Sequence, residues 1–460
     1  MICCAHSRCP LIIKNYYGER MHFRVALVGA LVVMGGATAS AAGIPDLIEP
    51  GSVSVPAFRD QASLDVISVS QLSELSPSVE RAAARAAAKA GGVSVPGRSA
   101  MIPMTRITRG TTAVQIAPAG FFIPMGFTVL APEAAVRLVS AETSAAIAAG
   151  QVVLGATSAS LRGAVAGDVV ELEAANGSLV GLTIGRVAPD DEIGGAEMVV
   201  SPAAADRLGL TAVTRSIIWG FRSRAEIDEA LKAEGLVPPS TRISRSWDAP
   251  SPDSVISLSQ TKKLLGEFAF RPTGTDAVDL AGGWSDANIH PRVTFNDIGV
   301  RAACHNVVHP AIQGALSEVA AAGLAGLVNV ANTNAVGGCF NPRYNRVTGN
   351  LGFLSRHSWG QAFDMNISEN PQGATPKLDC RIVRIFRKWG FAWGGNFMSK
   401  DGQHFEWVGQ PRDQLLYPST YCPNPGSPAV TQAAQSRSSS PARATSVVTL
   451  FAEDGFAPES

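Results

Sequence analysis

Two histidines and one aspartate in the C-terminal third of this 460-residue chain have the types and spacing of metal ligands. His357 and Asp364 belong to the segment Ser-Arg-His-Ser-Trp-Gly-Gln-Ala-Phe-Asp, where Gly360 and Ala362 are small enough for the backbone to turn tightly. His404 follows in the segment Asp-Gly-Gln-His-Phe-Glu. Zinc takes imidazole nitrogen and carboxylate oxygen as ligands, and three protein ligands leave one position open for water. The pattern therefore predicts a catalytic zinc site.

Three polar residues beside these ligands could serve such a site. Asp401 precedes His404, and Gly402 permits a turn across which the Asp401 carboxylate could reach a water on the metal. A carboxylate in that place can act as a general base. Ser355 has no histidine–aspartate relay assigned to it, so we expect it to support the first ligand rather than to act as a nucleophile. Glu406 is either a carboxylate that orients a ligand or a surface acid.

A second pair of histidines resembles a zinc-binding helix only in its spacing. His305 and His309 are four residues apart, but Asn306 stands where such a helix carries its catalytic glutamate. We therefore expect both histidines to be structural or surface residues.

The complete pattern is Ser-x-His-x-x-Gly-x-Ala-x-Asp, then Trp-Gly-Gly, then Asp-x-x-His-Phe. It resembles the zinc D-alanyl-D-alanine carboxypeptidase and L-alanyl-D-glutamate endopeptidase family, which includes the vancomycin-resistance carboxypeptidases. The resemblance covers residues 255–423 and implies that His357, Asp364 and His404 bind Zn²⁺. One departure is Asn396, because relatives often carry an acid after Trp-Gly-Gly.

The resemblance also implies a mechanism and a substrate. Asp401 would be the general base for a metal-activated water, and an upstream arginine, for which we choose Arg343 over Arg346, would polarise the scissile carbonyl. The expected substrate is a peptidoglycan stem peptide, cut by either carboxypeptidase or endopeptidase activity. The alternative is a catalytically inactive zinc-binding module for cell-wall recognition or sensing. Asp401 and Arg343 favour an enzyme, because a pure binder needs neither.

The N-terminal residues predict export. Residues 1–42 read as a leader and signal peptide, in which Met21 could be the true start. The apolar run at 25–34 is too short to span a bilayer, so we expect no stable membrane span after signal removal and a secreted or cell-envelope location. The formal net charge is zero, which gives no indication of nucleic-acid binding.

The cysteines that remain after the leader all lie in the C-terminal third. An even number in an oxidising compartment predicts two disulfides, with three possible pairings left open, and four free buried thiols are the alternative. These residues are Cys304, Cys339, Cys380 and Cys422.

The sequence patterns of the helices and strands that must position the site predict an α+β fold. A zinc peptidase domain at 255–423, with helices on a small, mostly antiparallel sheet, would follow a small strand-rich α+β domain of unknown function at 101–235. Residues 43–100 read as helix and linker, and 424–460 as a disordered tail rich in Ser, Pro and Ala.

Short sequence patterns in residues 101–235 predict individual strands and helices. Alternating apolar residues on both sides of Asn176-Gly177 predict a hairpin. Met198-Val-Val followed by Ser201-Pro202 predicts a strand and then a helix that stops at Gly209.

Overall fold

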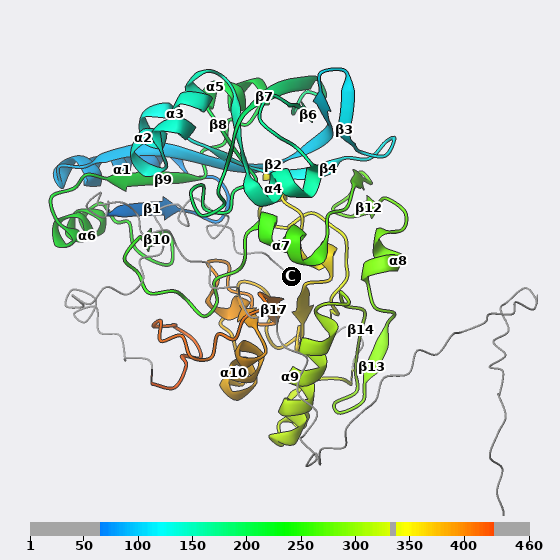
Figure 1. Cartoon of the computed structure of the whole chain (residues 1–460). Helices are drawn as coiled ribbons and strands as arrows, with labels where there is room; N and C mark the ends of the chain where they lie inside the picture. The colour runs from blue at the N-terminus through cyan, green and yellow to red at the C-terminus, as the bar shows by residue number, and fades with distance from the viewer. Residues whose placement is uncertain (1–64, 332–336, 427–460) are drawn as a thin grey trace, which may run out of the picture. The chain divides into compact units, whose positions relative to one another are not determined.

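The structure is a computed structural model that describes residues 65–331 and 337–426, and all of them belong to one compact unit, Phe58–Ser460 (Figure 1). The predicted leader and signal peptide, and the predicted tail beyond 426, lie outside the described residues. Among the described residues, no helix is both long and apolar enough to cross a membrane.

A ten-stranded sheet organises the first part of the described chain, in the order β10-β1-β9-β2-β4-β8-β5-β7-β6 with β3 on β2. Only the pairs β4–β8 and β5–β7 are parallel. The long strand β2 pairs in succession with β9, β4 and β6, so different parts of its length join three other strands. The strands are β1 (Val66–Ser70), β2 (Val93–Arg109), β3 (Thr112–Ile116), β4 (Ile123–Val129), β5 (Val152–Gly155), β6 (Val169–Glu173), β7 (Leu179–Ala188), β8 (Met198–Val200), β9 (Arg215–Trp219) and β10 (Arg242–Arg245).

Six helices accompany this sheet: α1 (Pro77–Lys89), α2 (Pro132–Leu138), α3 (Ala141–Ala148), α4 (Ala156–Arg162), α5 (Pro202–Arg207) and α6 (Arg224–Ala233). The alanine-rich helix α1 buries Ala83 and Ala86 in a cluster with Ile218 of β9 and Leu231 of α6. Small side chains allow a helix to approach its neighbours closely, which is why alanine suffices here.

Two local predictions are confirmed in this region. Strands β6 and β7 pair antiparallel around the Asn-Gly turn, with Glu173 opposite Leu179. Helix α5 follows β8, and the Ser201 side chain accepts a hydrogen bond from the Ala204 amide at 3.3 Å. Gly209 ends that segment with φ +77°, a left-handed conformation that glycine adopts without strain.

The part of the chain after residue 255 contains small sheets and separate helices. Two of these sheets are hairpins, and the third is the antiparallel sheet β15-β17-β16. The elements are α7 (Leu258–Leu265), β11 (Phe270–Pro272), β12 (Val278–Leu280), α8 (Trp284–Asn288), β13 (Val293–Phe295), β14 (Val300–Ala302), α9 (His309–Ala321), η1 (Ala325–Leu327), η3 (Gly349–Leu351), η4 (Arg356–Trp359), β15 (Ala362–Asp364), α10 (Cys380–Lys388), β16 (Phe391–Trp393), η5 (Gly394–Asn396) and β17 (His404–Trp407).

The sheet β15-β17-β16 separates an aromatic core from a polar face. Phe363 and Phe405 lie opposite each other on β15 and β17, and both rings pack against Phe386 of α10. Successive side chains on a strand point to opposite faces. The polar neighbours Asp364 and His404, which are also a register pair, are therefore directed away from this core.

Both predicted disulfides are present, and they resolve the pairing that the sequence leaves open. Cys304 pairs with Cys339, and Cys380 pairs with Cys422. The first bond ties the end of β14 to the segment before η3, and the second ties the start of α10 to the chain after β17.

Buried charges join helix α7 to the strand-rich region. The ammonium group of Lys262 lies 2.9 Å from the Glu197 carboxylate and 3.0 Å from that of Glu267. Arg162 of α4 contacts the same two carboxylates. We call these four residues the junction cluster; the side chains of Arg162, Lys262 and Glu197 are fully buried.

Candidate metal centre

The structure brings His357, Asp364 and His404 together from η4, β15 and β17. One ligand atom from each residue lies within 4.8 Å of the others, and all three residues are buried. The Asp364 carboxylate lies between the two rings, 3.3 Å from Nε2 of His357 and 3.0 Å from Nδ1 of His404. Ligands on a tetrahedral zinc lie about 3.3 Å apart, so these groups fit an ion of that size.

The ring orientation of His357 is fixed by a backbone contact. Its Nδ1 lies 3.0 Å from the carbonyl oxygen of Cys339, which can only accept, so Nδ1 carries the proton. Nε2 then keeps its lone pair, and this atom is buried without a hydrogen-bond partner. A buried lone pair of this kind is what a metal ligand requires. The disulfide at Cys339 anchors the carbonyl that sets this arrangement.

Burial and neighbouring charges shift the pKa values of two of the proposed ligands. Burial alone would raise the pKa of Asp364, but the neighbouring imidazoles of His357 and His404 hold it well below its usual range. Burial alone would lower the pKa of His404, but its hydrogen bond to Asp364 and the nearby carboxylates of Glu406 and Asp401 raise it to about 10. The site therefore favours positive charge, whether a proton or a metal ion.

The Trp-Gly-Gly segment supports the turn that carries Asp401 and His404. The amide of Asp401 donates to the carbonyl of Gly394 at 2.9 Å, and the indole of Trp393 donates to the carbonyl of Gly402 at 3.0 Å. A Cβ on Gly394 would lie 2.6 Å from the Asp401 carbonyl oxygen and 3.1 Å from Cβ of His404. Glycine is thus needed at position 394 because two site residues pack directly on its backbone.

Asn396 after this segment has a structural partner. Its amide donates to the Asp253 carboxylate at 2.8 Å, and Arg387 binds the same carboxylate at 2.6 Å. An acid at position 396 would instead repel the Asp253 carboxylate, so asparagine suits this position in the chain.

Arg343 lies on the segment that pairs with η4. Its carbonyl accepts from the Ser355 amide at 2.9 Å and from the Ser358 hydroxyl at 3.1 Å. Its guanidinium donates to the Tyr344 carbonyl at 3.1 Å, and the residue is buried. The Ser355 side chain caps η4 by accepting from the His357 amide, which gives Ser355 the supporting place expected for it.

The sequence gives no indication of Gly337 or Arg356 as neighbours of the site, and it leaves the place of Glu406 open. A Cβ on Gly337 would lie 3.1 Å from Oδ2 of Asp364, so this glycine leaves room for the ligand carboxylate. Arg356, next to His357, is buried and approaches Glu406 to 3.4 Å. Glu406 is itself fully buried, which is incompatible with a surface acid. These contacts join segments far apart in sequence, so no local motif indicates them.

The second histidine pair lies apart from the metal centre. Nε2 of His305 lies 3.0 Å from the Leu265 carbonyl oxygen, and its Nδ1 accepts from the Val307 amide. His309 stacks on His290 with the ring centroids 4.0 Å apart.

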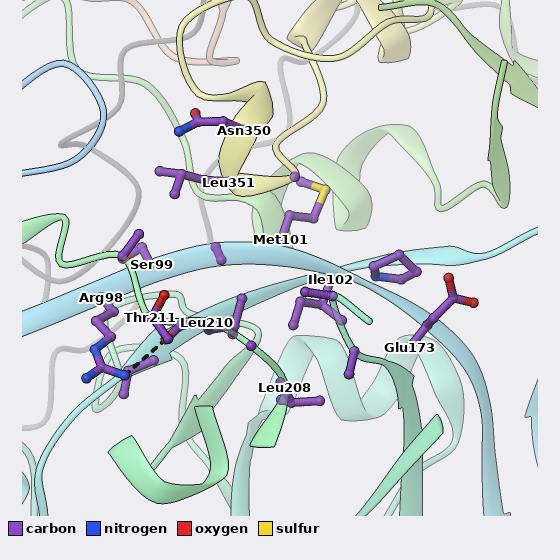
Figure 2. A pocket seen from close by; sticks show the side chains of 18 of the residues that line it. Arg98, Ser99, Met101, Ile102, Glu173, Leu208, Leu210, Thr211, Asn350 and Leu351 are labelled. Carbon is purple, nitrogen blue, oxygen red and sulfur yellow. Dashed lines mark hydrogen bonds between the residues drawn. The ribbon is translucent and has the colours of Figure 1, made fainter. Parts of the chain in front are cut away.

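A cavity of about 430 Å³ lies between β2 and the turn at η3 (Figure 2). Met101 and Leu351 line it from the two sides, and Arg98 donates to the Leu210 carbonyl at its edge. No residue of the metal centre lines this cavity.

Comparison with known protein families gives a match to part of the chain. A family model described as D-alanyl-D-alanine carboxypeptidase matches residues 348–407, the segment that holds all three residues of the metal cluster. The match supports a zinc-dependent metallopeptidase of this family without identifying a particular member. No curated protein matches the chain.

Proposed function

We propose that residues 255–423 form an extracytoplasmic zinc metallopeptidase that hydrolyses peptide bonds in peptidoglycan stem peptides. The observation that carries this proposal is the convergence of His357, Asp364 and His404 within 4.8 Å at a buried position. The family match over 348–407 supports the reaction class and a cell-wall peptide as substrate. The signal-like N-terminus and the two disulfides support a location outside the cytoplasm.

The roles of the chain's own residues follow from their chemistry. His357, Asp364 and His404 would hold Zn²⁺, which in such sites lowers the pKa of bound water and polarises a carbonyl group. Asp401 is buried, and its charge helps to raise the pKa of His404, which supports its assignment as the general base that accepts a proton from the attacking water. Asp401 then returns the proton to the leaving amine, and Arg343 donates hydrogen bonds to the developing oxyanion.

Digestion of purified muropeptides tests this proposal. We expect the full-length zinc-loaded protein to release products that mass spectrometry detects, EDTA to stop their release, and added zinc to restore it. Loss of a terminal D-alanine would identify a carboxypeptidase, whereas a cut within the stem would identify an endopeptidase. Zinc binding without any product would favour the inactive recognition module, and products that persist in EDTA would contradict a metallopeptidase.

A further inference from the structure

Glu406 is a buried carboxylate for which the proposed reaction has no use. It lies on β17 two residues after His404, so both side chains point to the same face of the strand. The residue is fully buried, and neither carboxylate oxygen has a hydrogen-bond partner. Burial of an ionised carboxylate is costly unless a cation stands beside it.

Arg356 supplies that cation from η4. Its Nε lies 3.4 Å from Oε1 of Glu406. Its two other nitrogens donate to the Thr261 hydroxyl at 3.2 Å and to the Ile256 carbonyl at 3.0 Å, both at the start of the C-terminal region. The guanidinium is therefore held in place from α7 and its N-terminal flank.

The other oxygen of Glu406 faces a ligand ring. Oε2 lies 3.9 Å from Nε2 of His404, an electrostatic contact that is longer than a hydrogen bond. The opposite ring nitrogen, Nδ1, faces Asp364 at 3.0 Å. A negative charge beside Nε2 favours the tautomer that carries its proton there, which leaves the Nδ1 lone pair for a metal. Carboxylates commonly orient ligand histidines in this way.

We propose that Arg356 is a positioning residue, which holds Glu406 against Nε2 of His404 and thereby makes His404 present Nδ1 to the metal. His357 presents the opposite nitrogen, Nε2, because its Nδ1 bonds the Cys339 carbonyl. The inference rests on the proposed metal site and does not depend on which peptide is cut.

Two measurements on the full-length protein test this role. Competition with a chromophoric chelator gives the zinc affinity, and the absorption spectrum of the Co²⁺-substituted protein reports how the metal is coordinated. The variants are Glu406→Gln, Arg356→Met and the double variant Arg356→Met/Glu406→Leu. The control is Arg162→Met, which removes an equally buried arginine from the junction cluster. Thermal unfolding is recorded for each variant without zinc.

We expect each single variant to bind zinc about 10- to 100-fold more weakly and to change the Co²⁺ spectrum. Arg162→Met should lower stability but leave zinc affinity unchanged. The double variant removes both charges, so its stability should recover towards that of the wild type while its zinc affinity stays low. Recovery of both together would show a merely structural ion pair and overturn the inference.

Two results separate this inference from the metal site itself. Unchanged affinity and an unchanged Co²⁺ spectrum in Glu406→Gln and in the double variant would overturn the positioning role alone. Failure of the wild-type protein to bind zinc would overturn the proposed metal site, and the positioning role with it.

Discussion

Two groups of buried charged residues, the junction cluster and the metal centre, differ in how their polar atoms are paired. In the junction cluster, two cations face two carboxylates at about hydrogen-bond distance, and Glu197 also accepts from the Gly126 amide at 2.9 Å. Nε of Arg162 has no hydrogen-bond partner there, but it is a donor and cannot bind a metal. In the metal centre, Nε2 of His357 is buried with no hydrogen-bond partner. Burial of charge alone therefore does not identify a functional site, whereas a buried ligand nitrogen without a hydrogen-bond partner, beside two other potential ligands, indicates one.

Mutations in the two groups should therefore have different effects. Changes at the metal centre should alter catalysis or zinc affinity, and changes in the junction cluster should alter stability.

The largest effect is expected at Asp401. Asp401→Asn removes the proton acceptor but keeps the shape of the side chain, so hydrolysis of muropeptides should fall about 100- to 10,000-fold while zinc stays bound. Turnover measured by mass spectrometry and zinc content by plasma emission check both parts. Asp279→Asn, an exposed acid in the same region, is the control and should retain activity. Full activity in Asp401→Asn would remove Asp401 from the mechanism.

Lys262 tests the junction cluster. Lys262→Met leaves Glu197 and Glu267 buried with only Arg162 as a counter-charge, so the free energy of unfolding should fall by about 3–5 kcal/mol. Urea denaturation measures this loss. Lys263→Met is the matched control, because Lys263 is the exposed neighbour on the same helix and its replacement should change stability by less than about 0.5 kcal/mol. Equal stability of the two variants would show that the cluster does not hold the regions together.

A substitution at Gly337 should have a smaller effect than those at Asp401 and Lys262, and it should act on zinc affinity. Gly337→Ala places a methyl group 3.1 Å from both Cβ and Oδ2 of Asp364, and this ligand must shift by a few tenths of an ångström. We expect zinc to bind about tenfold more weakly, as measured by chelator competition. Gly282→Ala, where a new Cβ meets no atom within 4 Å, should bind as the wild type does. Wild-type affinity in Gly337→Ala would mean that the position of Asp364 is not limited by this glycine.

The smallest effect concerns pH and His309. Burial, and then the charge of His290, lower the pKa of His309, so the folded state binds a proton less readily than the unfolded chain. Stability should thus be fully present above the unfolded pKa of about 6.5 and decrease as the pH falls below it. His309→Asn should make the denaturation midpoint less dependent on pH between about 7 and 5. An identical dependence in both proteins would contradict this assignment.

The sequence predicts those features that depend on neighbouring residues. The Asn176-Gly177 turn identifies its hairpin because the two strands adjoin it in sequence. The three proposed ligands are recognisable because their residue types and spacing form one motif. The strands β1 and β2 extend the sheet back to Val66, within a range for which a helix and linker are predicted. The partners of β1 are β9 and β10, far along the chain, and no local pattern encodes such pairing.

Local sequence patterns likewise do not predict which distant residues surround the site. Arg356 occupies a variable position inside the ligand motif, and its role is visible only when Thr261 and Glu406 are brought beside it. The disulfide pairing likewise depends on which cysteines the fold brings together.

Zinc binding by the full-length protein tests the central claim most directly. Equilibrium dialysis of the wild type and of the His357→Ala, Asp364→Ala and His404→Ala variants, with circular dichroism to establish folding, would measure stoichiometry and affinity. We predict about one zinc ion per wild-type chain and a large loss of affinity in every folded variant. Undiminished zinc binding in these variants would contradict the claim that the three side chains form the metal site.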